Sequence, residues 1–162
     1  AEAKIELNQI DQSVLDAINQ VRARAYGVEY TNTSAYPAIT TMDQKKLRTI
    51  IRRERRVEFA KEGLRYMDLI RWKIAGKALT RPNYGMLYPV DLLKEKVVNK
   101  GLWFWPSTPQ IDEDCIPDFS TMEKEGLIAP MSQRLWNDRQ YLWPIPTKEI
   151  LINENLKQNE GY

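Results

Sequence analysis

The sequence has no histidine and a single cysteine among its 162 residues, and each absence excludes a class of chemistry. Without histidine, Ser-His-Asp and Cys-His catalysis and histidine metal sites are excluded. Cys115 has no partner for an internal disulfide, and zinc sites built on several thiolates are excluded as well. Most hydrolase mechanisms therefore lose the residue on which they depend.

Long apolar runs and a net charge of one sign are missing as well. No stretch approaches the ~20 apolar residues needed to cross a membrane, and the N-terminal AEAKIELNQI has neither the basic region nor the apolar core of a signal peptide. With 24 basic and 22 acidic residues, no overall field points to nucleic acid or an acidic membrane surface. Because 43% of its residues are hydrophobic, the chain is expected to form one globular unit. The lack of a signal peptide and of a membrane span indicates either a cytoplasmic protein or a chain that has been processed or truncated.

What the sequence does contain, in its first half, is helical periodicity. Apolar residues recur every three or four positions over residues 11–26, which predicts a helix. Residues 27–40 mix Gly, Pro, Ser, Thr and Asn without such a period, so we expect a loop. Thr41 opens a capping-box signature for a long helix over 41–63, which ends at a glycine. A second helix is expected over 64–75.

The second half changes character, because eight of the nine prolines lie between residues 76 and 146. This composition predicts ordered loops with short elements. Residues 91–99 have a helical pattern, and LWFWP at 102–106 is typical of an edge strand that a proline ends. Thr147 is placed to cap a last short helix with the sequence KEILIN.

Two carboxylates lie on the apolar stripe of the helix expected over 41–63. Glu54 and Glu58 are four residues apart and share a helix face, which would suit a general acid/base pair. A buried ion-pair network is the structural alternative and the one we favour, because a desolvated carboxylate requires cations and hydrogen bonds around it. Arg65 and Arg71 on the following helix are the expected partners, and Asp68 is expected to join them.

Two runs of like charge allow a functional and a structural interpretation each. The basic run consists of Arg52, Arg53, Arg55 and Arg56. It is either a nucleic-acid patch or a solvated helix face, and the balanced charge of the chain favours the solvated face. The acidic run consists of Asp112, Glu113, Asp114 and Asp118. Its oxygens would suit calcium, but the spacing lacks the EF-hand pattern, so we expect an acidic surface turn and no metal.

Aromatic residues of the loop-rich stretch 81–106 are the best binding candidates by chemistry. The candidate ligand-binding residues are Trp105, Tyr84, Trp103 and Tyr88. A flat ring held in a loop can stack on the C–H face of a sugar, while nearby polar groups bond its hydroxyls. The structural alternative is that some of these rings fill the core. The remaining tryptophans, Trp72, Trp136 and Trp143, are expected in the core.

Three longer segments occur in a specific order. INQVRARA at residues 18–25 precedes LRTIIRRERRVEFAKEGLRYMDLIRW at 47–72, and YLWPIPTKEI at 141–150 leads into the terminal NENLKQNEGY. Together they resemble the C-terminal portion of the SusD/RagB family of glycan-binding outer-membrane lipoproteins. The resemblance implies a mainly α SusD-like C-terminal region over residues 1–162, with helices and a large irregular, loop-rich portion.

Further expectations come from the resemblance alone. It implies a fragment of a longer chain, since the lipidated cysteine and the N-terminal tetratricopeptide-like region of the family are missing and Cys115 follows no signal-peptide pattern. It also implies a surface protein of the outer membrane that binds oligosaccharide and works with a SusC-like TonB-dependent transporter in nutrient uptake. It implies a binding protein without bond-breaking chemistry, so we expect no enzymatic activity, no cofactor and no nucleic-acid binding. Membrane contact would come only from the missing lipid anchor.

Two other functions stay open at this point. The residues themselves allow an intracellular helical adaptor that binds protein or RNA through the arginine-rich helix face. A carboxylate glycosidase comes third, since its catalytic pair requires a cleft ~5 to 10 Å across.

Overall fold

The computed structural model describes residues 1–102 and 107–162 and is mainly α-helical, as the sequence predicts. The edge strand expected over 102–106 and the side chains of Trp103 and Trp105 lie outside the described residues. The chain divides into two compact units. Unit 1 contains Ala1–Gly63 and Asp112–Cys115, and unit 2 contains Leu64–Ile111 and Ile116–Tyr162.

Unit 1 is built from three helices, α1 (Glu2–Glu6), α2 (Gln12–Tyr26) and α3 (Gln44–Glu58). The helix predicted over 11–26 is confirmed as α2, and residues 27–40 contain neither helix nor strand, as expected. Asp11 caps α2 by accepting the N–H of the residue two positions on, and a hydrogen bond from Lys4 lowers the pKa of Asp11 to about 2. The helix α1 was not predicted.

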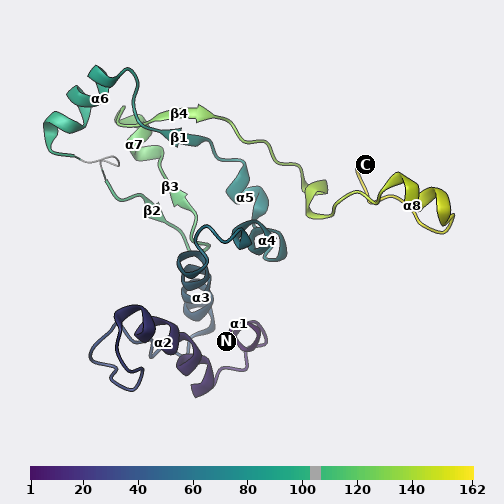
Figure 1. Ribbon diagram of the computed structural model, residues 1–162, viewed down its shortest axis with the longest axis horizontal. Coiled ribbons are helices and arrows are strands. Elements are labelled where there is room, and N and C mark those ends of the chain that lie inside the picture. Colours follow the sequence, from purple (N-terminus) through teal and green to yellow (C-terminus); the bar gives the residue numbers. More distant parts are fainter. Residues whose placement is uncertain (103–106) are drawn as a thin grey trace. The chain divides into compact units, whose positions relative to one another are not determined.

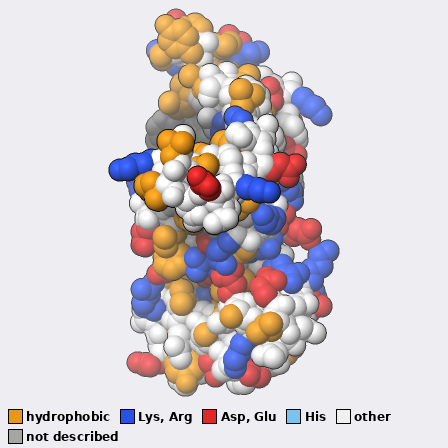
Figure 2. Space-filling model, turned by 90° about the vertical axis from the view of Figure 1, so that its right-hand side faces the viewer, with side chains coloured by type: hydrophobic (Ala, Val, Ile, Leu, Met, Phe, Trp, Pro, Cys, Tyr) orange, Lys and Arg blue, Asp and Glu red, His pale blue; other side chains and the backbone are white. Residues whose placement is uncertain are grey.

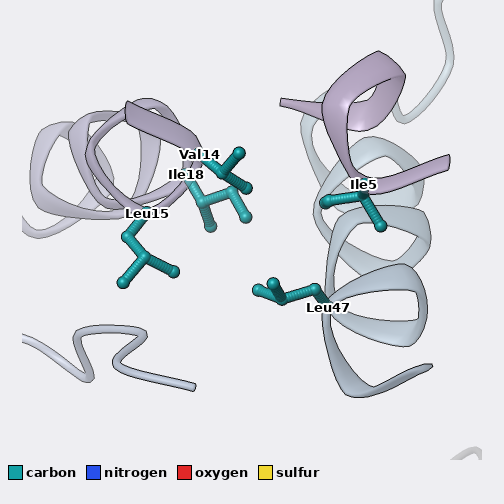
Figure 3. Close-up of a cluster of buried hydrophobic side chains, with 5 residues drawn as sticks. All are labelled: Ile5, Val14, Leu15, Ile18 and Leu47. Carbon is teal, nitrogen blue, oxygen red and sulfur yellow. The ribbon is translucent and has the colours of Figure 1, made fainter. Parts of the chain in front are cut away.

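The core of unit 1 forms where α1, α2 and α3 meet (Figure 3). Its buried residues are Ile5, Val14, Leu15, Ile18 and Leu47, of which Ile5, Val14 and Leu47 are 0% exposed. Three of them come from α2, which explains why this helix has a clear apolar period in the sequence.

The boundaries of α3 differ from the expected ones. Asp43 caps the helix by accepting the Lys46 N–H at 2.8 Å, while Thr41 accepts the N–H of Asp43 itself at 3.2 Å. The predicted capping box at Thr41 is therefore wrong, because an aspartate closer to the first turn takes its place. The helix also ends at Glu58 rather than at Gly63, and residues 59–63 form turns and bends.

Unit 2 has short helices and two small antiparallel sheets, β1 with β4 and β2 with β3 (Figure 1). Its elements in chain order are α4 (Leu64–Arg71), α5 (Ala75–Leu79), β1 (Asn83–Gly85), α6 (Val90–Lys96), the 3-10 turn η1 (Val98–Lys100), β2 (Gln110–Ile111), β3 (Pro117–Asp118), α7 (Ser120–Lys124), β4 (Ala129–Ser132), the 3-10 turn η2 (Asp138–Tyr141) and α8 (Thr147–Ile152). The helices expected in 91–99 and over KEILIN are thus confirmed. The predicted cap at Thr147 is wrong, because Thr147 is the first residue of α8 and the N-cap position is Pro146, which makes no side-chain cap hydrogen bond.

The single helix expected over 64–75 is two helices. Lys73 adopts a left-handed backbone with φ of 57°, and its N–H bonds the Ile70 carbonyl at 3.1 Å, which closes α4 before α5 begins. Leu69 of α4 and Ala75 of α5 are then buried in one cluster, against which Trp136 packs. No glycine marks the break, so composition could not predict it.

The C-terminal segment, which we define as residues 142–152, corrects another expectation. Trp143 is 75% exposed, whereas the sequence placed it in the core. Leu142, Leu151 and Ile152 are 60%, 78% and 71% exposed, and α8 has no buried residue. This segment therefore contributes apolar surface rather than core. None of the described helices is long and apolar enough to cross a membrane.

Candidate functional site

The candidate ligand surface begins at the pairing of β1 with β4, which brings together two segments far apart in the sequence (Figure 1). Tyr84 lies opposite Pro130 and Gly85 opposite Ala129, with an irregularity in register between Asn83 and Tyr84. A Cβ atom at Gly85 would lie 2.7 Å from Cγ of Met131, so any other residue there would require the exposed Met131 side chain to move. The strand pair thus fixes the backbone on both sides of Tyr84.

Tyr84 is held in place through both its ring and its hydroxyl. The hydroxyl donates to Oε2 of Glu123 on α7 at 2.6 Å, and this hydrogen bond raises the pKa of Tyr84. Its ring makes a tilted contact with Phe119, with centroids 5.6 Å apart and an angle of 52°. Because one part of the half-buried ring is already packed, Tyr84 is better suited to supporting the loop than to stacking on a sugar.

Tyr88 presents a more accessible ring. It is 84% exposed and follows Leu87, which is 8% exposed, so the alternation along this loop turns Leu87 inward and Tyr88 outward. Met86 and Val90 on either side are 45% and 55% exposed. We call Met86, Tyr88 and Val90 the 86–90 patch. Among the candidate ligand-binding aromatic residues that the structure describes, Tyr88 has the open aromatic face that sugar stacking requires.

Glu54 and Glu58 are bound by arginines of α2, not by those of residues 64–71. Arg22 donates from Nε and Nη2 to Oε1 of Glu54 at 3.0 and 2.7 Å, and Arg24 forms an ion pair with Glu58. The expectation that Arg65 and Arg71 would supply the partners is therefore corrected. The side chains of Arg22 and Glu54 are only 18% and 20% exposed, so this pair is largely buried. The signal for it was present in the VRARA sequence.

Arg65 and Arg71 instead flank an aromatic ring of their own helix region. Their guanidinium carbons lie 5.7 and 4.8 Å from the ring centroid of Trp72. Arg71 also donates from Nε to Oδ1 of Asp68 at 2.9 Å, and Asp68 is 3% exposed. This cluster satisfies a buried carboxylate and thereby stabilises α4.

The cations of α3 are largely occupied by acceptors within unit 1. The contacts are Lys45 with Glu113 at 3.2 Å, Arg48 with Glu6 at 2.8 Å, Arg52 with Asp114, Arg55 with Glu2 at 3.8 Å, and Arg56 with the carbonyl of Cys115. The hydrogen bond from Arg48 also lowers the pKa of Glu6. Cations bound in this way do not form a free phosphate-binding face.

The acidic run divides between two roles. Asp112, Glu113 and Asp114 belong to unit 1, where Asp112 accepts the Asp114 N–H at 3.0 Å and the other two bind α3 cations. Asp118 belongs to β3 in unit 2 and accepts the Ser120 N–H at 3.0 Å, which lowers the pKa of Asp118. Buried Cys115 continues the unit 1 turn with a φ of 59°. These contacts explain the acidic residues as parts of turns.

One face of the exposed surface mixes charges of both signs with apolar side chains (Figure 2). On the face drawn in Figure 2, acidic and basic groups are interspersed and hydrophobic side chains lie between them. A face of this kind, with interspersed charges, does not steer a polyanion.

Comparisons with known proteins agree with the fold. The model of the SusD family matches residues 1–162. A crystal structure of a SusD-like protein from Bacteroides fragilis NCTC 9343 is similar, with 29% sequence identity and a TM-score of 0.60. The match covers 99% of this chain and 23% of that chain, so this chain spans about a quarter of the similar protein's length. No curated protein matches the chain.

Proposed function

Because the chain belongs to the SusD family, we propose that it takes part in binding oligosaccharides at the surface of the outer membrane. In this proposal the bound glycan passes to a SusC-like TonB-dependent transporter, and no glycosidic bond is broken. Attachment to the membrane would come from a lipid anchor outside these residues. The proposal covers the function of a family-length protein, of which this chain supplies about a quarter by comparison with the similar structure.

The observation that carries the proposal for this chain is the exposed ring of Tyr88. Water leaves a flat aromatic face readily when the C–H face of a pyranose replaces it, and the adjacent Met86 and Val90 extend the apolar area. The β1–β4 pair and the Tyr84 hydrogen bond to Glu123 hold the start of this loop, which lowers the entropy lost on binding. The patch is neutral, so we expect binding that depends little on salt.

Calorimetric titration of a panel of neutral plant and host oligosaccharides tests the proposal. One exposed ring supports only weak binding, so we expect dissociation constants on the order of millimolar. Tyr88→Ala should weaken binding by roughly fivefold, which corresponds to about 1 kcal/mol of stacking. Tyr30→Ala is the matched control, because Tyr30 is an exposed tyrosine of unit 1, whereas the 86–90 patch belongs to unit 2.

Equal binding by the Tyr88→Ala and Tyr30→Ala variants would remove Tyr88 from the site. Absence of binding by every variant and by the unaltered chain would contradict a glycan site in these residues. Salt-sensitive binding of RNA would favour the adaptor alternative, but the α3 cations that such an adaptor would use are bound to Glu6, Asp114 and other acceptors of unit 1.

A further inference from the structure

A second concave surface lies in unit 1, between α2 and α3. It has a volume of about 390 Å³, which is in the range of small-ligand sites. Tyr26, Pro37, Arg53 and Val57 contribute to its lining, together with the ion-paired Glu54 and Glu58. We call this surface the α2/α3 groove. It is distinct from the 86–90 patch, which belongs to unit 2.

The lining of the groove includes one cation, Arg53, that has no acceptor among the described residues. Arg22 is bound to Glu54 and donates from Nη1 to the Pro37 carbonyl at 2.5 Å, so its guanidinium is occupied. Arg53, by contrast, is exposed and has no acceptor among the described residues. The nearby Glu58 has its own partner in Arg24. The groove therefore offers a single uncompensated positive charge.

Beside that charge the groove is apolar and aromatic. Tyr26 at the end of α2 is 59% exposed, and Val57 on α3 is 69% exposed. The exposed phenol ring and the branched aliphatic side chain form an apolar surface on which a ring with an apolar face can stack. Tyr26 is the last residue of α2, which ends at Gly27 in the left-handed conformation. A ligand suited to the groove thus combines one anionic group with a flat, partly apolar body.

We propose that the α2/α3 groove binds a saccharide that carries a carboxylate, such as a uronate unit of an acidic oligosaccharide. The planar guanidinium of Arg53 matches a carboxylate in a bidentate geometry, and the sugar ring stacks on Tyr26. A phosphate dianion fits less well, because Glu54 and Glu58 line the same groove and repel the second charge. The inference rests on the proposed function, since it names a class of glycan.

The methyl glycoside of galacturonate and its methyl ester are the probes, because they share the same ring skeleton and differ by the single negative charge that the groove is proposed to bind. The unaltered chain should bind the acid roughly tenfold more tightly than the ester at about 50 mM salt, and this preference should shrink at about 300 mM salt. Arg53→Gln should remove the preference and leave the weak binding of the ester unchanged. Lys46→Gln is the matched control, because Lys46 is the other α3 cation without an acceptor among the described residues and lies outside the lining of the groove.

The outcomes separate this inference from the proposed function. Equal affinity for the acid and the ester would overturn the acidic specificity, and an equal loss on Lys46→Gln would reduce it to non-specific attraction. If neutral oligosaccharides bind in a Tyr88-dependent way and the galacturonate glycoside does not bind, the groove is excluded and the proposed function stands. If no saccharide binds at all, both are wrong.

Discussion

Glu54 and Glu58 occupy adjacent turns of α3 and each bind an arginine, but their surroundings differ. Arg22 and Glu54 are 18% and 20% exposed, whereas Arg24 is 67% exposed beside Glu58 at 32%. A hydrogen bond to a charged group contributes more when both partners are shielded from water. The same residue type at the same spacing therefore serves two different roles, one structural and one mostly solvated.

This contrast predicts unequal costs of substitution. Glu54→Ala should lower the free energy of unfolding by about 2 kcal/mol, because a largely buried guanidinium loses its partner. Glu58→Ala should cost only about 0.5 kcal/mol, as expected for an exposed ion pair. Both changes replace glutamate by alanine within one helix, so they serve as mutual controls in urea unfolding followed by circular dichroism. Equal costs would contradict the assigned burial.

Single residues also mark the limit of sequence-based prediction. The two acidic positions on the apolar stripe correctly indicated that arginines must bind there, because an isolated charge is costly near a core. Which arginines they are depends on the packing of α2 against α3, and neighbouring positions in sequence suggested the wrong ones. The local sequence indicates that a carboxylate on the apolar stripe requires a cationic partner, whereas the tertiary structure determines which arginine that partner is.

At the level of elements, prediction succeeded where the signal was local. The apolar period of residues 11–26 predicted α2, whose Val14, Leu15 and Ile18 form the unit 1 core. The break at Lys73 was missed, because a left-handed backbone at a lysine has no compositional signature. The β1–β4 pair was missed because its strands are short and far apart in sequence, and strand pairing is not encoded by either strand alone.

The C-terminal segment, residues 142–152, supports a prediction of its own. Trp143→Ala should change the unfolding free energy of this chain by less than about 0.5 kcal/mol, because an indole that is 75% exposed makes few contacts. Leu47→Ala, at a position that is 0% exposed, should cost about 3 kcal/mol and is the positive control. Urea unfolding of both variants gives the comparison. A loss of several kcal/mol for Trp143→Ala would place its ring in a core.

At the scale of the whole molecule, the distribution of charge argues against a polyanionic partner, and the apolar surface argues for a neutral one. The cations of α3 are largely bound to acidic side chains and carbonyls, which leaves little attraction for a polyanion. The apolar surface, by contrast, includes an open aromatic ring at Tyr88 on a loop held at its start by the β1–β4 pair. Together with membership of the SusD family, this balance supports the proposal that a glycan is the ligand.

The most direct test of this account is amide chemical-shift mapping of the chain during titration with a neutral oligosaccharide that it binds. Binding through the 86–90 patch should move the amide signals of residues 83–90 first, with a dissociation constant on the order of millimolar. The same signals should stay in place when the Tyr88→Ala variant is titrated. Shifts that spare residues 83–90 and gather on α3, or shifts that persist unchanged in Tyr88→Ala, would contradict the central claim.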